Sequence, residues 1–251
     1  MYNGYRSQIM ITKLQINELA RFYKIDEFTI LREYLQLLVI SYIYQEKEAG
    51  AIIFKGGTAL RLIYGSPRFS EDLDFSTTLS FSDIEKFIAK LKQKIIIEVP
   101  EFIFSQIYKG KEGIRYNIKY QSDSFNFPLN LRLDFHIVKI IKNIDKSVLT
   151  TRFPVLIFPT IYHLNKKEIL AEKLECLKTR FKGRDIFDIW YLFTSGEVIY
   201  NKKEIKIYID KINEFDDNDL VRDLNKFLPL SQRMILLELK KILLKYFENT
   251  I

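Results

Sequence analysis

The sequence predicts an α+β protein in which a mixed β-sheet flanked by helices lies between N-terminal helices and a C-terminal helical region. Apolar residues recur at helical spacing at both ends of the chain, whereas short runs of alternating apolar and polar residues dominate the middle. Strands and helices do not alternate regularly, as they would in a doubly wound parallel sheet. We therefore expect a core with its N-terminal helices over residues 1–160 and a helical region over residues 161–251.

The individual elements follow from apolar spacing, caps and breaks. Helices are expected at 12–23 and 27–48, then a strand, a glycine turn and a helix within 51–65, and a strand near 72–76. Ser82 is the predicted N-cap of a helix that ends near residue 97, and strands follow at 102–108, 114–121, 129–138 and 153–158. From about residue 165 to 249 the pattern is helical, and Pro229-Leu230-Ser231 marks a break before a last amphipathic helix.

Composition limits the classes of protein to which this chain can belong. It has 251 residues, of which 47% are hydrophobic, enough to bury a large core. Its formal net charge of +7 favours a polyanionic partner without proving one. The lone Cys176 excludes an intrachain disulfide, the first residues lack a signal-peptide pattern, and the most apolar stretch, 35–44, is shorter than the roughly 20 residues that span a bilayer. A soluble protein of the reducing cytoplasm, with no membrane partner, is expected.

A pair of glycines marks the first candidate site. Gly56 and Gly57 follow the apolar run 51–54, which reads as a buried strand, and precede a short helix for which Thr58 is the predicted N-cap. Glycine lets the backbone turn sharply and approach a ligand, and the free N–H groups of a helix N-terminus favour an anion such as a triphosphate. Taken alone, such a pair is more often a plain tight turn.

Two aspartates at spacing i, i+2 come shortly afterwards. In a strand, Asp72 and Asp74 share one face while Leu73 and Phe75 enter the core. Carboxylates about 7 Å apart along a strand suit Mg²⁺, which prefers oxygen ligands. A solvated strand face is the plainer interpretation of this pair alone, but its combination with the glycine turn favours a site for phosphate and metal.

A third acid would complete such a site, and Asp134 is the best candidate. Residues 129–138 alternate strictly, so that Asp134 shares a polar face with Asn130, Arg132 and His136. The alternative is an edge strand with a solvated face. We expect His136 to be a neighbour of the site rather than a ligand, and His163 to fall in a loop without a role.

A second block of charged residues follows on two predicted helices. Between Glu168 and Arg180, helical spacing buries Ile169, Leu170, Leu174, Leu177 and Phe181. It leaves Lys173 and Arg180 near each other, where two cations can clamp a triphosphate. Gly183 is expected to break the helix, and the next helix carries Asp185 and Asp188 one turn apart. The alternative is an ordinary exposed cluster of ion pairs.

These motifs carry a family resemblance over roughly residues 50 to 195. G-G-T-A-L, followed by R-F-S-E-D-L-D-F, resembles the nucleotidyltransferase-like AbiEii/AbiGii toxin family, a branch of the polymerase-beta-type nucleotidyltransferase superfamily. A second block, E-I-L-A-E-K-L and then R-F-K-G-R-D-I-F-D-I, is similar to that family's later motifs. The Gly-Ser that is usual in the wider superfamily is Gly-Gly here, with Thr58 next.

The resemblance implies a nucleotidyltransferase-like sheet and Mg²⁺-dependent transfer, with Mn²⁺ as an alternative ion, of a nucleoside monophosphate from an NTP. It implies Asp72, Asp74 and Asp134 as metal ligands, with Lys173 and Asp188 as a further catalytic pair. The implied nucleotide contacts are Gly56, Gly57, Thr58, Arg68, Ser70, Lys173, Arg180, Arg184 and Asp185. In family terms the acceptor is RNA, notably a tRNA end, and the protein is the toxin of a type IV toxin–antitoxin or abortive-infection system, with a cognate antitoxin as its partner.

Three other functions remain open at this point. A nucleotidyltransferase that acts on a protein or a small molecule would keep the same donor site. A catalytically silent nucleotide- or RNA-binding module would have little need for all three aspartates. A kinase-like phosphotransferase would attack the γ-phosphate instead of the α-phosphate.

Overall fold

A computed structural model describes residues 10–121, 127–180, 182–196 and 202–249. These residues form two compact units. Unit 1 consists of the described residues up to Gly65 together with Phe69–His163, and unit 2 consists of Ser66–Arg68 with the described part of Leu164–Ile251. The chain therefore leaves unit 1 for three residues and returns to it before the first aspartate of the D-x-D motif.

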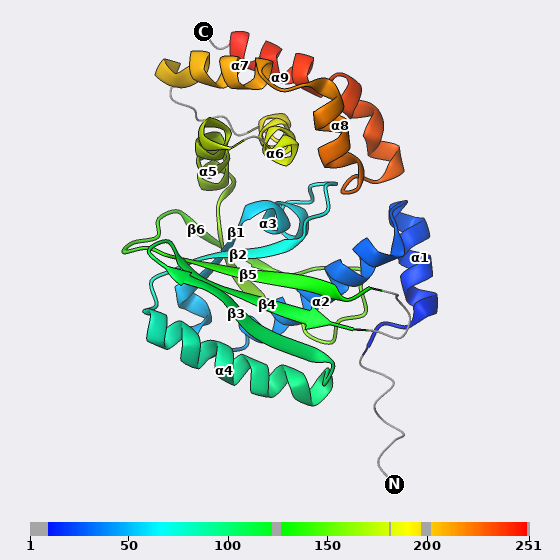
Figure 1. Ribbon diagram of the computed structural model, residues 1–251, viewed down its shortest axis with the longest axis vertical. Coiled ribbons are helices and arrows are strands. Elements are labelled where there is room, and N and C mark those ends of the chain that lie inside the picture. Colours follow the sequence, from blue (N-terminus) through cyan, green and yellow to red (C-terminus); the bar gives the residue numbers. More distant parts are fainter. Residues whose placement is uncertain (1–9, 122–126, 181, 197–201, 250–251) are drawn as a thin grey trace. The chain divides into compact units, whose positions relative to one another are not determined.

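Unit 1 is built on one seven-stranded mixed sheet, in the order β3-β4-β5-β2-β1-β7-β6 (Figure 1). Its strands are β1 (Ile52–Lys55), β2 (Asp72–Thr77), β3 (Phe102–Gly110), β4 (Gly113–Tyr120), β5 (Leu129–Ile137), β6 (Ile144–Val148) and β7 (Thr160–Leu164). The central strand β2 runs antiparallel to β1 and parallel to β5, so the sheet is mixed. The predicted fold class is confirmed.

The helices of unit 1 are α1 (Lys13–Tyr23), α2 (Glu27–Ile43), α3 (Gly56–Leu62) and α4 (Phe81–Glu98), with a 3-10 helix at Lys47–Ala51. Side chains fix where several of them begin. Thr12 and Gln15 form a capping box before α1, and the Asp26 carboxylate accepts from the N–H of Thr29 at the start of α2.

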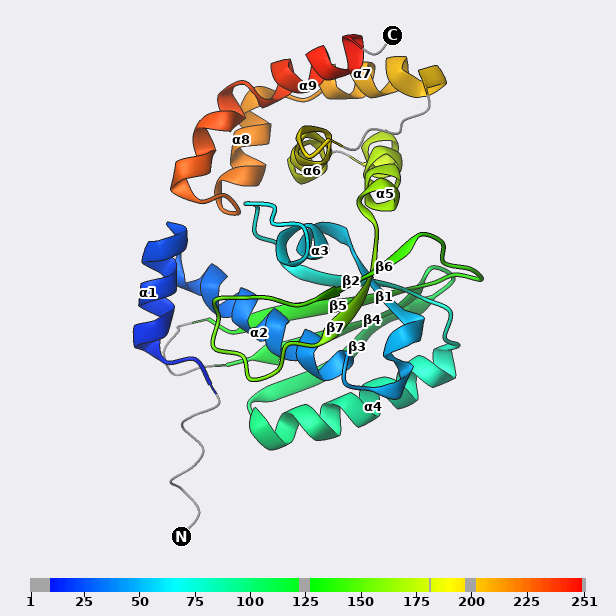
Figure 2. The same cartoon turned by 180° about the vertical axis from the view of Figure 1, so that it is seen from behind.

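The two faces of the sheet differ in chemistry. Phe54, Phe75 and Phe135 are fully buried on one face, and the ring centroids of Phe75 and Phe135 lie 5.2 Å apart. Helix α4 covers this face and places Phe87 edge-on to Phe135, and each such buried side chain contributes about 1.5 to 3 kcal/mol. Helix α3 lies on the opposite face (Figures 1 and 2), which carries the polar side chains of β2 and β5.

Unit 2 is helical. It contains α5 (Lys166–Thr179), α6 (Gly183–Thr194), α7 (Ile205–Asn213), α8 (Asp217–Asn225) and α9 (Leu239–Glu248), with 3-10 helices at Lys202–Glu204 and Leu230–Leu237. The predicted break at Pro229 is the start of the second 3-10 helix. Gly183 begins α6 after α5 has ended, as expected, whereas Phe181 lies outside the described residues.

Several element predictions were wrong. Ser80, not Ser82, caps α4, and α2 ends at Ile43 rather than near residue 48. The segment 153–158 forms no strand, because Pro154 and Pro159 remove backbone donors from an otherwise apolar run. The short strands β6 and β7 lie on either side of it, and His163 belongs to β7, buried, rather than to a loop.

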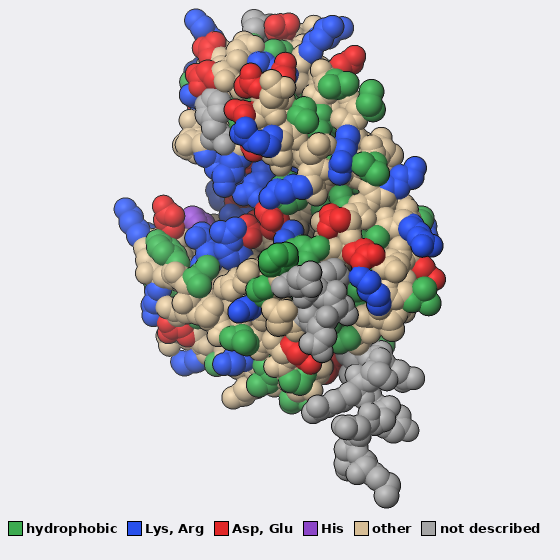
Figure 3. Space-filling view, turned by 45° about the vertical axis from the view of Figure 1, so that its right-hand side comes forward, with side chains coloured by type: hydrophobic (Ala, Val, Ile, Leu, Met, Phe, Trp, Pro, Cys, Tyr) green, Lys and Arg blue, Asp and Glu red, His purple; other side chains and the backbone are tan. Residues whose placement is uncertain are grey.

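Two surface properties bear on function. No helix in the described part of the chain is both long and apolar enough to cross a bilayer. Acidic side chains lie among the Lys and Arg side chains over much of the face drawn in Figure 3, so net charge alone does not outline a nucleic-acid surface.

Candidate functional site

The glycine turn brings the start of α3 against the D-x-D strand. Gly56 has φ +76°, in the left-handed region that favours glycine. A methyl group added at Gly56 would also collide with the carboxylate of Asp74. Glycine is therefore required at this position for two reasons. Its backbone conformation is left-handed, and any side chain would overlap with that of Asp74.

Thr58 is placed differently from the prediction. It is the third residue of α3, not its N-cap, because β1 continues through Lys55 and the helix begins directly at Gly56. Its side chain is fully buried, and its hydroxyl donates to the backbone carbonyl of Asp72. Thr58 thus fixes α3 to the first residue of β2, and any phosphate contact from this residue has to come from its backbone.

The three predicted carboxylates share one face of the sheet. Asp74 on β2 and Asp134 on β5 are direct neighbours across the parallel pair, where strands lie about 4.8 Å apart. Asp72 is two residues before Asp74, on the same face. All three side chains are half-buried. The fold brings together two segments that are about 60 residues apart in the sequence.

Each of these carboxylates has a cation as its cross-strand neighbour. Arg132 opposes Asp72 and forms a fork with it, with Nε 3.0 Å from Oδ1 and Nη2 2.9 Å from Oδ2. Arg115 on β4 opposes Asp134 and donates from Nε to Oδ2 at 2.7 Å. Lys55, at the end of β1, opposes Asp74. Burial alone would lower the pKa of Arg132, but Asp72 outweighs it and raises that pKa.

A pocket of about 190 Å³ opens beside these strands. Its lining includes Lys55, Asp74, Tyr108, Arg115, Asp134 and His136. Ser70 precedes the D-x-D strand, and its backbone carbonyl accepts a hydrogen bond from the side chain of Gln36. The pocket thus joins two of the predicted metal ligands with side chains that can donate to an anion.

The donor set fits a divalent ion that prefers oxygen. Adjacent carboxylates on parallel strands, and a glycine that leaves room for one of them, are what such an ion needs. Among the described residues, however, no group of three or more acidic, His or Cys side chains is already arranged to hold a metal. Asp72 and Asp134 face arginines instead, so the carboxylates have to turn from these partners before they bind an ion.

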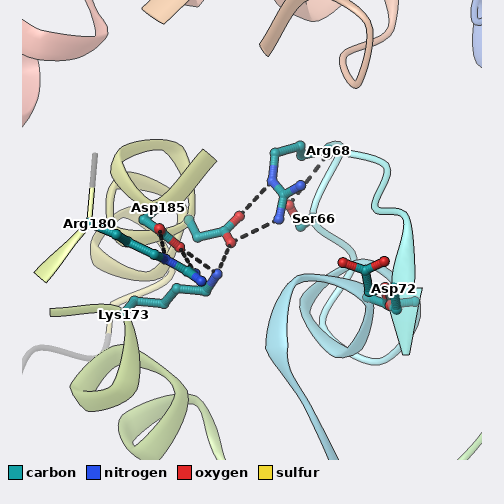
Figure 4. Close-up of polar contacts among 8 residues, drawn as sticks. Ser66, Arg68, Asp72, Lys173, Arg180 and Asp185 are labelled. Atoms are coloured by element: carbon teal, nitrogen blue, oxygen red, sulfur yellow. Dashed lines mark hydrogen bonds and ion pairs between the residues drawn. The ribbon is translucent and has the colours of Figure 1, made fainter. Parts of the chain in front are cut away.

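The second predicted block forms a buried ion network within unit 2 (Figure 4). Arg68 forms a fork with Asp188, at 2.7 and 2.8 Å. Lys173 Nζ lies 2.7 Å from Asp188 Oδ2 and 2.9 Å from Asp185 Oδ1. Arg180 forms a second fork with Asp185, at 2.8 and 2.9 Å. The two aspartates share Lys173, and each has an arginine of its own.

Burial would raise the pKa of both aspartates, but the cations outweigh it. Lys173 and Arg180 hold the pKa of Asp185 down, at about 2, and Arg68 and Lys173 lower the pKa of Asp188. Burial alone would lower the pKa of Lys173, whereas Asp188 and Asp185 raise it. Asp185, Asp188 and Lys173 are therefore all charged at neutral pH.

The network overturns one alternative and encloses two of the expected nucleotide contacts. Lys173 is only 7% exposed. Asp185 and Asp188 are fully buried, so the alternative of an exposed ion-pair cluster is wrong. Arg68, an expected nucleotide contact, is 1% exposed because its guanidinium is enclosed with Asp188. Arg184 is half-buried.

Sequence reasoning missed two of the three cations around the carboxylates. Strict alternation in β5 placed Arg132 on the face of Asp134, but it did not predict the pairing of Arg132 with Asp72. Arg115 and Lys55 carried no such signal, since only the pairing of β4 with β5 and of β1 with β2 brings them to the site.

Comparison with known proteins agrees with this fold. JHP933 from Helicobacter pylori has a TM-score of 0.59 and 20% identity, over 90% of this chain and 96% of that one. MenT4, a nucleotidyltransferase toxin from Mycobacterium tuberculosis, has a TM-score of 0.61 and 17% identity, over 96% of this chain and 90% of that one. No curated protein matches the sequence.

A family model covers most of the chain. The model described as the nucleotidyl transferase AbiEii toxin of type IV toxin–antitoxin systems matches residues 38–245, a range that includes the glycine turn, the three carboxylates and the buried network. The resemblance found in the motifs is thereby confirmed, and the chain belongs to the AbiEii family of nucleotidyltransferase toxins.

Proposed function

We propose that this nucleotidyltransferase uses Mg²⁺, or Mn²⁺ in its place, to transfer a nucleoside monophosphate from an NTP to RNA, with a tRNA end as the acceptor. The observation that carries the proposal is the cross-strand placement of Asp74 beside Asp134, with Asp72 on the same face and Gly56 making room for the Asp74 carboxylate.

The roles of the residues follow from their positions. Asp72 and Asp74 hold the metal, which supplies charge neutralisation at the α-phosphate when it is bound. Backbone N–H groups at Gly56 and Gly57 bind donor phosphates beside it. Asp134 either completes the metal site or takes the proton of the acceptor hydroxyl. The hydroxyl oxygen bonds to the α-phosphorus, the bond to the β-phosphate oxygen breaks, and pyrophosphate leaves.

The residues of unit 2 are proposed as ligands of the leaving pyrophosphate, in particular Lys173, Arg180 and Arg184. Arg180 is more available than Lys173, since its side chain is 41% exposed whereas that of Lys173 is 9% exposed. For Lys173 to reach a phosphate, it has to leave one of two buried carboxylates. Asp188 acts through Lys173 and Arg68 as a positioning residue.

Support for RNA is the basic composition, with 39 Lys and Arg against 32 Asp and Glu. The family is one of toxins of toxin–antitoxin systems. We accordingly propose a cognate antitoxin that counteracts the transfer of nucleotides to cellular RNA.

The test is incubation of the protein with Mg²⁺, total cellular RNA and protein, and each NTP labelled at the α-phosphate. Label on RNA supports the proposal, label on protein alone reassigns the acceptor, and label on neither contradicts transfer to a macromolecule. A parallel set labelled at the γ-phosphate separates nucleotidyl transfer from a kinase reaction, because only a kinase would pass that label on. Asp74→Ala is the inactive variant, and Asp145→Ala, an exposed aspartate on β6 of the same sheet, is its matched control.

A further inference from the structure

We propose that Arg132 and Arg115 compete with a divalent ion for the carboxylates of Asp72 and Asp134, so that the ion must displace these guanidinium groups in order to bind. The inference rests on the proposed function, since it concerns the same carboxylates. It assigns a role to Arg132 and Arg115, neither of which the family motifs include.

The register of the sheet places a cation opposite each carboxylate. Asp72 opposes Arg132, Asp74 opposes Lys55 and Asp134 opposes Arg115. Cross-strand partners project to the same side of a sheet, with Cβ atoms about 4.5 to 5.5 Å apart. The cations come from three different strands, β5, β1 and β4, so the match follows from the pairing of the strands.

Two of the cations, both arginines, donate hydrogen bonds to the carboxylate oxygens that a metal would use. Arg132 holds both oxygens of Asp72, and Arg115 holds Oδ2 of Asp134 through Nε and Nη2. A carboxylate oxygen that accepts from a guanidinium points its lone pairs at nitrogen, and a metal needs the same lone pairs. Each of these arginines therefore competes directly with an ion for its aspartate.

Both ion pairs are partly exposed to water, so each carboxylate can exchange its arginine for another ligand. The side chains of Arg132 and Asp72 are 43% and 21% exposed, and those of Arg115 and Asp134 are 34% and 30% exposed. Pairs this open to water are weak enough for an ion to break. In the metal-free state the cations offset the repulsion that three neighbouring carboxylates would otherwise suffer.

The experiment measures binding of Mn²⁺ to nucleotide-free protein, by the electron paramagnetic resonance signal of the free ion. Arg132→Gln removes the competing guanidinium and should tighten Mn²⁺ binding roughly 3- to 5-fold, as expected for an exposed ion pair. Arg115→Gln should act in the same direction. Arg132→Lys keeps the charge but cannot form the fork, so its dissociation constant should lie between those of the wild type and Arg132→Gln.

A matched control separates competition from a general effect of charge. Lys119 is exposed on β4, on the same face as Arg115, and opposes Asn130 rather than an aspartate. Lys119→Gln removes one positive charge from this face and should leave Mn²⁺ affinity within about 1.5-fold of the wild type, since exposed charges at this separation are largely screened. Equal tightening in Lys119→Gln and Arg132→Gln would overturn the proposal.

The outcomes also distinguish this inference from the proposed function. If Asp74→Ala abolishes Mn²⁺ binding while Arg132→Gln and Arg115→Gln leave the affinity unchanged, the metal site stands and the competition by the arginines is wrong. If neither the wild type nor the arginine variants bind Mn²⁺, both proposals fail. Circular dichroism on each variant confirms that the measurement reports on folded protein.

Discussion

A cluster of aspartates meets lysine and arginine side chains in each unit, but water reaches the carboxylates of only one of these clusters. In unit 1, the side chains of Asp72 and Asp134 are 21% and 30% exposed, and each faces an arginine that is itself open to solvent. In unit 2, Asp185 and Asp188 are fully buried and share Lys173. The residue types are the same, and the burial differs.

The difference shows how burial decides what an ion pair can do. An exposed pair contributes about 0 to 1 kcal/mol and exchanges partners readily. Loss of one partner from a buried pair costs about 3 to 5 kcal/mol, because it leaves a desolvated charge without compensation. The carboxylates of Asp72 and Asp134 can therefore exchange their arginines for ligands, whereas those of Asp185 and Asp188 hold helices α5 and α6 and the segment Ser66–Arg68 together.

Asp188→Asn is the variant for which we expect the largest effect, because it removes a buried carboxylate. This change leaves Arg68 and Lys173 buried with one carboxylate fewer, so we expect unfolding to become easier by about 3 to 5 kcal/mol. Urea denaturation followed by circular dichroism measures the loss. Asp145→Asn, on the exposed face of β6, is the control and should change stability by less than about 0.5 kcal/mol. A similar small change in Asp188→Asn would show that burial does not set the cost here.

Asp74→Ala tests the half-buried carboxylates of unit 1. The Asp74 carboxylate is half-buried and borders the pocket, so its loss should reduce transfer of labelled nucleotide by about 100-fold or more, nearly 3 kcal/mol of transition-state stabilisation. The free energy of unfolding in urea should stay within about 0.5 kcal/mol of the wild type. Normal activity in a folded Asp74→Ala protein would remove this residue from the site.

The carboxylates of unit 1 could be predicted from the sequence better than the ion network of unit 2. Alternation in β2 and β5 was enough to place Asp72, Asp74 and Asp134 on a polar face, because local periodicity decides which way a strand residue points. The pairing of Arg68 with Asp188 spans 120 residues and has no local pattern that could predict it.

Helical spacing placed Lys173 near Arg180, and both contact Asp185, but it did not predict the burial of Lys173. The periodicity identified the apolar side of α5 correctly, yet it could not show that acidic side chains of α6 would enclose the polar side. Strands β6 and β7 were missed for a related reason. Each has five residues, and β7 pairs with β1 at a single recorded register position, so tertiary pairing rather than local pattern defines them.

Lys173→Met tests whether a buried cation of unit 2 also binds nucleotide. It removes two charge-assisted contacts, while Arg180 and Arg68 still compensate the aspartates, so we expect a loss of about 1.5 to 3 kcal/mol in stability. The decisive measurement is the rise in thermal midpoint that NTP and Mg²⁺ produce, relative to each protein without nucleotide. An undiminished rise together with undiminished transfer would limit Lys173 to a structural role.

The smallest expected effect is the pH dependence of the network. The pKa of Asp185 is lowered to about 2, and that of Asp188 is also lowered, so their stabilisation is complete above the unfolded value of about 3.9 and is lost as pH falls toward 2. The pKa of Lys173 is raised, so its contribution is present below about 10.5 and is lost as pH rises through the higher folded value.

Thermal midpoints at pH 7, 4 and 2.5, compared between the wild type and Asp185→Asn, measure this dependence. The gap between the two proteins should be nearly constant from pH 7 to about 5 and should narrow below pH 4. A gap that widens on acidification would reverse the sign that we assign to the Asp185 pKa.

The short passage of Ser66–Arg68 through unit 2 has a practical consequence for dissecting the protein. A fragment that begins at Leu164 would contain Asp188 but not Arg68, so two buried aspartates would lose one of their three cations and the fragment should not fold as a free-standing helical domain. Conversely, a protease that cut the backbone after His163 would not release that fragment, because Arg68 of the first piece would still be enclosed with Asp188 of the second. Supplying the missing loop as a separate peptide would be the way to recover a folded unit 2, which makes the protein a candidate for split-fragment complementation.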